Sequence, residues 1–164
     1  MPYKACGKLE IARNVDQPLA MKISEGPKLF GRDIPAGAYF VDIHIAGKAV
    51  SCLVDTGACV TVMSECLFRS LPNLELKSPP ESMQVFEGVV QGSQLKAKGV
   101  VYTPIEIANF TSGPHPVVVA PSTRMECILG LDFLDKYSIS VDTANRQLRI
   151  CSSGKETVCV DVKP

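Results

Sequence analysis

The sequence has no excess of charge of either sign and no long apolar run. Its 17 basic residues balance 17 acidic ones, so the formal net charge is zero. A nucleic-acid-binding module normally carries a basic excess, and this chain has none. The purely apolar stretches are short, as at Val117–Ala120, and none approaches the length that a bilayer span requires. We therefore expect a protein with neither nucleic-acid nor membrane partners.

The N-terminus also lacks the apolar core of a secretory signal peptide, because Met1–Gly7 is followed by mixed polar sequence. The seven cysteines are odd in number, and no two of them have CxxC spacing. This argues against a disulfide framework or a zinc site and favours reduced thiols that pack as small apolar side chains. His44 and His115 lie far from each other and from any cysteine cluster, and we interpret them as surface or strand-face residues. The sequence thus predicts a cytoplasmic protein without a metal or a cofactor.

A length of 164 residues fits one domain or one domain with an extension. Residues 1–35 show weak periodicity and several prolines and glycines, so we interpret them as a weakly structured N-terminal extension. The compact domain, residues 36–164, is predicted to be mainly β. Residues 41–45 alternate between apolar and polar side chains, which is the period of a half-buried strand, and 49–54 returns as a second strand after a turn.

Short elements are predicted along the rest of the domain. Ser64 is positioned to cap a helix that Pro72 stops. Two β-rich stretches, 83–90 and 95–107, predict a long hairpin around Gln91-Gly92-Ser93. The other expected elements are a strand at 59–63, helices at 65–71 and 131–137, and strands at 117–120, 139–142, 147–150 and 157–162.

The most informative segment is Asp55-Thr56-Gly57-Ala58, which follows the apolar pair Leu53-Val54. A carboxylate that activates water must be held rigidly at the edge of an apolar cleft, and the strand anchors the entry to this turn. Gly57 lets the backbone approach the carboxylate and donate a hydrogen bond to it, because no Cβ stands in the way. Ala58 leaves room for a substrate, and the Thr56 hydroxyl can fix the loop through a buried hydrogen bond. The alternative is an Asp in an ordinary strand-to-turn connection, where Asp and Gly are common.

Together with Ile128-Leu129-Gly130 downstream, this loop resembles the aspartic proteases of the retropepsin type, which occur in retroviruses, LTR retrotransposons and a few cellular proteins. Residues 129–134 are more similar to retrotransposon and DNA-damage-inducible-type members than to lentiviral proteases. The resemblance covers about residues 38–150. It implies a mainly β, closed, barrel-like acid-protease fold with a flap hairpin, supplied by residues 83–103, and one short C-terminal helix. It also implies that residues 128–130 pack across the catalytic loop.

The chain holds one such motif, since Asp142-Thr143-Ala144 lacks the glycine and is predicted to lie in a hairpin turn. An aspartic protease needs two carboxylates, one to take a proton from water and one to donate a proton to the scissile carbonyl. Like charges this close cannot both ionise, so the pair shares a proton, and aspartic proteases are the standard example of this behaviour. The resemblance therefore implies a homodimer in which Asp55 of each chain faces its twin.

Some positions depart from the pattern of many retroviral members. Cys59 stands where they have Asp or Thr, and Leu131 stands where they have Arg, so the ion pairs made by those residues are absent. We therefore expect the dimer contacts to come from the 139–150 hairpin and from a C-terminal interface strand at 157–162. The predicted flap carries Gly88 and the tripeptide at 91–93 in place of the double glycines of lentiviral flaps.

The resemblance implies an aspartic endopeptidase that acts on a peptide or polyprotein, with the polyprotein of a retroelement as the expected substrate. The implied catalytic residues are Asp55, Thr56 and Gly57. The implied substrate-binding residues are Leu53, Ala58, Val90, Gln91, Gly92, Ser93 and Ile128. Two alternatives remain open: a catalytically silent retropepsin-fold module for dimerisation or peptide binding, and an enzyme domain within a cellular protein such as a ubiquitin-linked shuttle.

Overall fold

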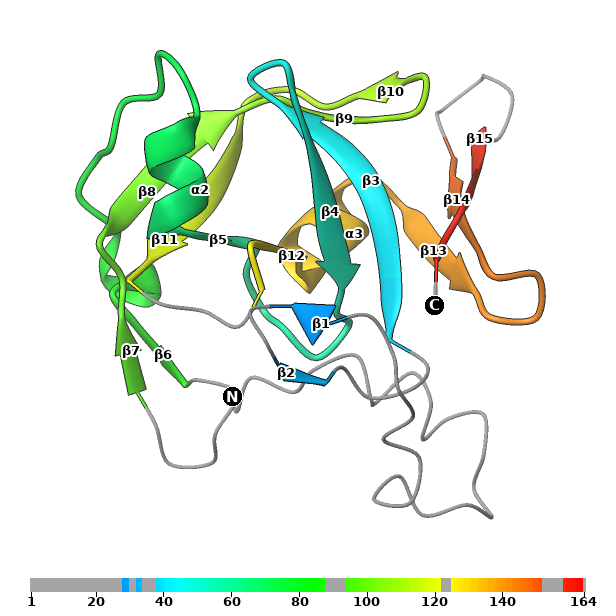
Figure 1. Cartoon of the computed structure of the whole chain (residues 1–164), viewed down its shortest axis with the longest axis horizontal. Coiled ribbons are helices and arrows are strands. Elements are labelled where there is room, and N and C mark those ends of the chain that lie inside the picture. The colour runs from blue at the N-terminus through cyan, green and yellow to red at the C-terminus, as the bar shows by residue number, and fades with distance from the viewer. Residues whose placement is uncertain are drawn as a thin grey trace.

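The computed structural model describes residues 28–29, 32–33, 38–87, 94–121, 125–151 and 158–163 (Figure 1). Its helices are α2 (Glu65–Ser70), α3 (Leu131–Lys136) and the short 3-10 helix η2 (Glu81–Met83). The strands are β1 (Lys28–Leu29), β2 (Arg32–Asp33), β3 (Tyr39–Ile45), β4 (Lys48–Val54), β5 (Val62–Ser64), β6 (Val85–Glu87), β7 (Gln94–Lys96), β8 (Gly99–Thr103), β9 (Ile105–Ile107), β10 (Phe110–Thr111), β11 (His115–Ala120), β12 (Cys127–Leu129), β13 (Ile139–Asp142), β14 (Gln147–Ile150) and β15 (Val158–Asp161). The prediction of a mainly β domain is confirmed. Among the described helices, none is long and apolar enough to cross a membrane.

The hairpin of β3 and β4 shows how the sequence pattern sets the main sheet. From residue 41 to residue 45 the side chains alternate between buried and exposed, as predicted. The two strands pair antiparallel from Tyr39 opposite Val54 to Ile45 opposite Lys48. The two residues between them, Ala46 and Gly47, both have positive φ, 49° and 79°. Tight two-residue hairpins that follow the right-handed twist of a sheet need this backbone conformation.

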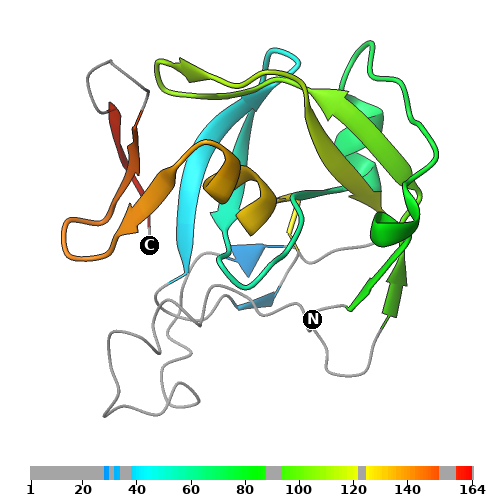
Figure 2. The ribbon, with the colours of Figure 1, turned by 180° about the vertical axis from the view of Figure 1, so that it is seen from behind.

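The main sheet has eight strands in the order β10-β9-β3-β4-β12-β5-β11-β8. Strand β12 lies between β4 and β5, parallel to β4 and antiparallel to β5, and β11 runs parallel to β5. The sheet curls strongly, and α3 lies against its far side in Figure 1, which becomes the near side in Figure 2. In the described part of the chain the strand order has two ends, so the closed barrel implied by the resemblance stays a prediction.

Two predicted strands differ from the structure in extent. The strand expected at 59–63 lies later, at Val62–Ser64, because residues 58–61 complete the Asp55 loop, where the Ala58 carbonyl accepts a hydrogen bond from Leu131 N. The stretch 95–107 forms parts of three strands, β7, β8 and β9, instead of one arm of a hairpin. Of these, β7 pairs with β6, whereas β8 is buried almost throughout and joins the main sheet beside β11.

Ser64 caps α2 as predicted, since its Oγ accepts a hydrogen bond from Leu67 N at 3.1 Å. Ser64→Ala removes this acceptor from a buried helix terminus. We expect the free energy of unfolding to fall by about 1 kcal/mol and the melting temperature by about 2–4 °C. Thermal unfolding followed by circular dichroism measures the change. The matched control is Ser51→Ala, at an exposed serine of β4, and equal losses in the two variants would contradict the contribution of the cap.

The C-terminal strand β15 pairs with β14 of the same chain, in a three-stranded sheet that also contains β13. Val158 and Val160 are half-buried against the main core, whereas Cys159 and Asp161 are exposed. Lys163 then pairs with Phe40 through two backbone hydrogen bonds. Part of the apolar face of this segment therefore packs against the core of its own chain. Its use as an interface between two copies stays a prediction.

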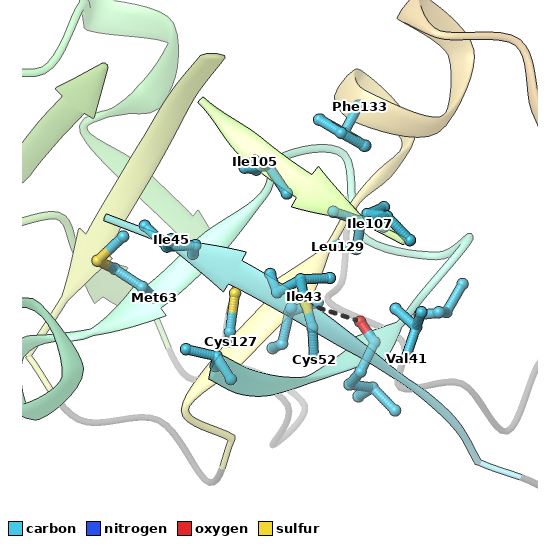
Figure 3. Packing of buried hydrophobic residues seen from close by; sticks show 14 of the residues in the cluster. Val41, Ile43, Ile45, Cys52, Met63, Ile105, Ile107, Cys127, Leu129 and Phe133 are labelled. Carbon is cyan, nitrogen blue, oxygen red and sulfur yellow. Dashed lines mark hydrogen bonds between the residues drawn. The ribbon is translucent and has the colours of Figure 1, made fainter. Parts of the chain in front are cut away.

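Two cysteines lie inside the core, on the neighbouring strands β4 and β12 (Figure 3). The thiol of Cys52 points to the Leu53 carbonyl oxygen at 3.8 Å. Burial, together with the neighbouring Cys127 thiol, raises the pKa of Cys52 well above its ordinary value, so the group stays protonated and apolar. The predicted packing of cysteines as small apolar side chains holds for these two. It is wrong for the four other described cysteines, 59, 66, 151 and 159, which are free but exposed.

Candidate active site

Asp55 lies in the turn that follows β4, and its side chain is buried. Its backbone N–H donates to the carbonyl of Leu129 in β12 at 3.0 Å, and its own carbonyl accepts from Ala58 N at 3.1 Å. Gly57 N donates to Asp55 Oδ1 at 2.8 Å, which is the hydrogen bond expected of this glycine. A carboxylate with an amide donor on one oxygen, carried by a backbone anchored at both ends, has a fixed direction.

The segment that follows β12 supports this loop from behind. Strand β12 runs parallel to β4 with Leu129 opposite Val54, and Leu131 N donates to the Ala58 carbonyl at 2.8 Å. Gly130 lies so close to the loop that a Cβ at this position would stand 2.5 Å from a loop carbonyl oxygen. Only a glycine permits this approach without displacement. The packing of residues 128–130 across the loop, which the resemblance implied, is therefore present.

A buried polar network lies directly behind Gly130 and is not among the predicted features. Thr61 Oγ1 accepts from Gly130 N at 3.1 Å and donates to Asp132 Oδ1 at 2.7 Å. The same Oδ1 accepts from Phe133 N at 2.8 Å, and Asp132 Oδ2 lies 3.0 Å from His115 Nε2. Thr61 and His115 are buried, whereas the Asp132 side chain is 18% exposed. Residues from β11, from α3 and from the segment just before β5 thus meet at a single carboxylate.

The sequence contains an indication that His115 is buried. The predicted strand begins at Val117, whereas β11 begins two residues earlier, at His115. On a strand, His115 shares one face with Val117 and Val119, and both valines are buried. Extending the strand back across Pro116 places the histidine on the core side. His44 is exposed on β3, as predicted for a surface histidine. His115 instead lies on a buried strand face, where its side chain contacts the Asp132 carboxylate.

The other residues predicted for the site have different positions. Thr56 is half-buried, and the buried hydrogen bond expected of its hydroxyl stays a prediction. Leu53, Ala58 and Ile128 are each about 1% exposed and belong to the main hydrophobic core. There they support the loop that carries the carboxylate. Their contribution to a substrate groove stays a prediction.

The base of the predicted flap is present as the antiparallel pair of β6 and β7, in which Phe86 lies opposite Leu95. A hydrogen bond from Ala97 N to the Gln84 carbonyl, 2.8 Å long, extends this pairing toward the main sheet. The predicted tip residues lie outside the described residues, so their contact with a substrate stays a prediction. These residues are Val90, Gln91, Gly92 and Ser93.

The chemistry that the described site offers is that of a carboxylate. Within the described ranges, no group of three or more His, Cys, Asp and Glu side chains is placed to hold a metal ion. The Asp55 loop presents one carboxyl group with a fixed direction at the end of a buried strand. Such a group can take a proton from water or donate one to a carbonyl oxygen, depending on its protonation state.

Comparison with known proteins links this loop to a family. The sequence model of the gag-polyprotein putative aspartyl protease family matches residues 41–136. DNA damage-inducible protein 1 of Yarrowia lipolytica is 30% identical over 149 residues, which cover 87% of this chain and 34% of that protein. UBA domain-containing protein Mud1 of Schizosaccharomyces pombe is 29% identical over 144 residues, covering 87% of this chain and 40% of that protein. The chain therefore spans at most 40% of the length of these two relatives.

Solved structures of low sequence identity share the fold. The retroviral protease-like domain of Ddi1 from Leishmania major superimposes with a TM-score of 0.61 at 20% identity, over 77% of this chain and 94% of that domain. The EIAV protease, solved in complex with an inhibitor, superimposes with a TM-score of 0.52 at 19% identity, over 63% of this chain and 90% of that protein. The described chain thus has a retropepsin-like fold.

Proposed function

The chain belongs to the gag-polyprotein putative aspartyl protease family, and from that premise we propose that it is an aspartic endopeptidase whose active site is built by two copies of the chain. The observation that carries the proposal is the Asp55 carboxylate, held by Gly57 N at 2.8 Å on a loop anchored to the Leu129 carbonyl. A group held in this way does not have to reorganise when charge develops during the reaction.

A second carboxylate is needed, and the other Asp-Thr pair of the chain does not supply it. Asp142 accepts hydrogen bonds from the backbone and side chain of Asn145 and forms an ion pair with Arg149 at 2.7 Å. The hydrogen bonds from Asn145, with a smaller contribution from Arg149, lower the pKa of Asp142 below its ordinary value. The Asp142 carboxylate therefore stabilises the turn between β13 and β14. In our proposal the second carboxylate is Asp55 of a second copy, related to the first by a twofold axis.

In the proposed reaction, a water molecule lies between the two Asp55 carboxyl groups, which share one proton. The ionised carboxylate takes a proton from this water as its oxygen attacks the scissile carbonyl carbon, and the protonated partner gives its proton to the carbonyl oxygen. As the tetrahedral intermediate collapses, one of its hydroxyl groups returns a proton to the carboxylate that is now ionised, the C–N bond breaks, and the departing nitrogen takes a proton from the other carboxyl group, so the pair again holds one proton. The products are a free carboxyl group and a free amine, and Thr56 and Gly57 hold the loop throughout.

We propose the polyprotein of a retroelement as the substrate, and the support for this comes from the family. Its description names a gag polyprotein, which supports cleavage of a retroelement polyprotein. The test is cleavage of a peptide library at mildly acidic pH, with inhibition by a peptide whose statine hydroxyl mimics the tetrahedral intermediate. Activity that rises steadily to pH 9, or that a metal chelator removes, would point to another mechanism. A folded dimer that binds peptides without cleaving them would establish the alternative, a catalytically silent dimerisation or peptide-binding module.

Because the proposed active site is shared between two copies of the chain, we expect specific activity to fall on dilution. A monomer carries one Asp55 and therefore half of the catalytic pair, so activity per chain should follow the fraction of dimer. Cleavage rates measured across a concentration series, beside sedimentation at the same concentrations, give both quantities. Full activity per chain from a species that sediments as a monomer would exclude the shared site. Zero net charge leaves little long-range repulsion to oppose the pairing of two copies.

A further inference from the structure

One peptide group connects Asp55 to the polar network behind the loop. The amide between Leu129 and Gly130 contributes its carbonyl to Asp55 N, at 3.0 Å, and its N–H to Thr61 Oγ1, at 3.1 Å. Because a peptide group is planar and rigid, a rotation on the Thr61 side of this amide also turns the carbonyl on the Asp55 side. The orientation of the Asp55 backbone is therefore coupled to the orientation of the Thr61 hydroxyl.

The Thr61 hydroxyl is in turn held by Asp132. It donates to Asp132 Oδ1 at 2.7 Å, and Phe133 N donates to the same oxygen at 2.8 Å. The second oxygen, Oδ2, lies 3.0 Å from His115 Nε2. The Asp132 side chain is 18% exposed, so without the imidazole water would compete for Oδ2, and the carboxylate would be held through Oδ1 alone. His115 is thus the residue that holds the outer half of the carboxylate in place.

Packing alone does not explain why a histidine occupies position 115. Its side chain is 2% exposed, and its ring stands edge-on to Phe133, with centroids 5.0 Å apart, and tilted to Tyr137, 6.1 Å away. Among the described residues, Nδ1 has no hydrogen-bond partner, so the polar function of the ring is its contact with Asp132. Placing a polar ring in an aromatic cluster costs free energy that a phenyl ring would not. The hydrogen bond between Nε2 and Asp132 offsets this cost.

We propose that His115 is a positioning residue for the proposed proteolytic reaction. Acting through Asp132 and Thr61, it fixes the 129–130 peptide group and hence the direction in which Asp55 presents its carboxyl group. It touches neither the substrate nor the reacting atoms. This inference rests on the proposed function for its catalytic consequence, whereas the coupling of His115 to the loop is a property of the fold alone.

The experiment compares three variants of the full chain. His115→Phe keeps an aromatic ring against Phe133 but removes the donor to Asp132. His115→Gln removes the ring but retains an N–H donor with similar reach. His44→Gln is the matched control, because His44 is exposed on β3. We expect His115→Phe to lower kcat by about 10- to 100-fold with KM almost unchanged, since misplacement of a catalytic group affects the transition state more than substrate binding. His115→Gln should recover most of the loss.

Amide hydrogen exchange provides a readout that does not depend on activity. In His115→Phe the amides of Asp55 and Gly130 should exchange at least about 10-fold faster than in the unaltered chain, because their hydrogen bonds open more often. Both amides should remain protected in His115→Gln and in His44→Gln. If the unaltered chain has no proteolytic activity, the proposed function fails, and the exchange rates alone decide the role of His115.

Two outcomes would overturn the inference. One is a folded His115→Phe protein with unchanged kcat and unchanged exchange at Asp55 and Gly130. The other is an equal loss of kcat in His115→Phe and His115→Gln with both amides still protected. If His115→Phe does not fold, Asp132→Ala breaks the same connection from a partly exposed position and is measured in the same two ways. Protected amides and an unchanged kcat in that variant would also refute the coupling.

Discussion

Replacing Asp55 with Asn is expected to lower kcat by about 10³- to 10⁴-fold, because the amide neither takes a proton from water nor donates one to the scissile carbonyl. The fold should persist. The Asn oxygen can accept the hydrogen bond that Gly57 N now donates to Asp55 Oδ1, so the loop keeps its anchor. Steady-state cleavage of a peptide from the library, with circular dichroism and sedimentation on the same samples, separates lost chemistry from lost structure.

The matched control is Asp135→Asn, the same exchange at an exposed position of α3. A mixing experiment then tests whether the site is shared. When Asp55→Asn chains are added to an equal amount of unaltered chains, above the concentration needed for dimerisation, random pairing leaves about half of the unaltered chains in active dimers. The observed rate should therefore fall by about half. A rate that does not respond to added Asp55→Asn chains would mean that each chain works alone.

Gly130→Ala is the second substitution with a large expected effect. The added Cβ would lie 2.5 Å from the Val60 carbonyl oxygen and 3.0 Å from that of Ala58. These are backbone atoms, so the 129–130 segment and the Asp55 loop must move apart. Forcing extra volume into a close-packed site costs about 1–3 kcal/mol, and a shift of about 1 Å in a catalytic group lowers the rate by about 100-fold.

Urea unfolding and kcat, measured on the same preparations, report the two consequences of this substitution. Gly113→Ala is the matched control, because a Cβ at Gly113 would meet no atom within 4 Å. Both variants lose the same backbone freedom in the unfolded chain, so the difference between them isolates the contact with the loop. Equal stability and equal activity of the two variants would show that the loop and the 129–130 segment are not tightly opposed in solution.

The parts of the fold that depend on neighbours in sequence could be predicted from it. The alternation in β3, the presence of a turn after it, the serine cap of α2 and the hairpin of β13 and β14 each follow from residues within one turn or one strand pair. For the same reason the Asp55 loop could be located and its hydrogen bond from Gly57 anticipated. Each of these features is stabilised locally, so the local pattern contains the information.

The features that were missed depend on pairing between distant segments. No local pattern shows that β12 inserts between β4 and β5, or that β8 leaves β7 to pair with β11. The network of Thr61, Asp132 and His115 was missed for the same reason. Its members come from β11, from α3 and from the segment before β5, and no pattern within one of these segments indicates the other two. The burial of His115 follows from the strand face it shares with Val117, but its partnership with Asp132 follows only from the assembled sheet.

The insertion of β12 has a consequence for when the site forms. Thr61 accepts a hydrogen bond from Gly130 N and donates one to Asp132, and these bonds join residues that are 69 and 71 positions apart. A chain that grows from its N-terminus therefore carries Asp55 for a long time before the segment that holds its backbone has been made. Closing a loop of this length costs entropy that is repaid only when the distant strand pairs. We expect the anchored Asp55 loop of each chain to form in a single late step, as β12 enters the gap between β4 and β5, so that two copies have complete half-sites to pair only after most of the domain exists.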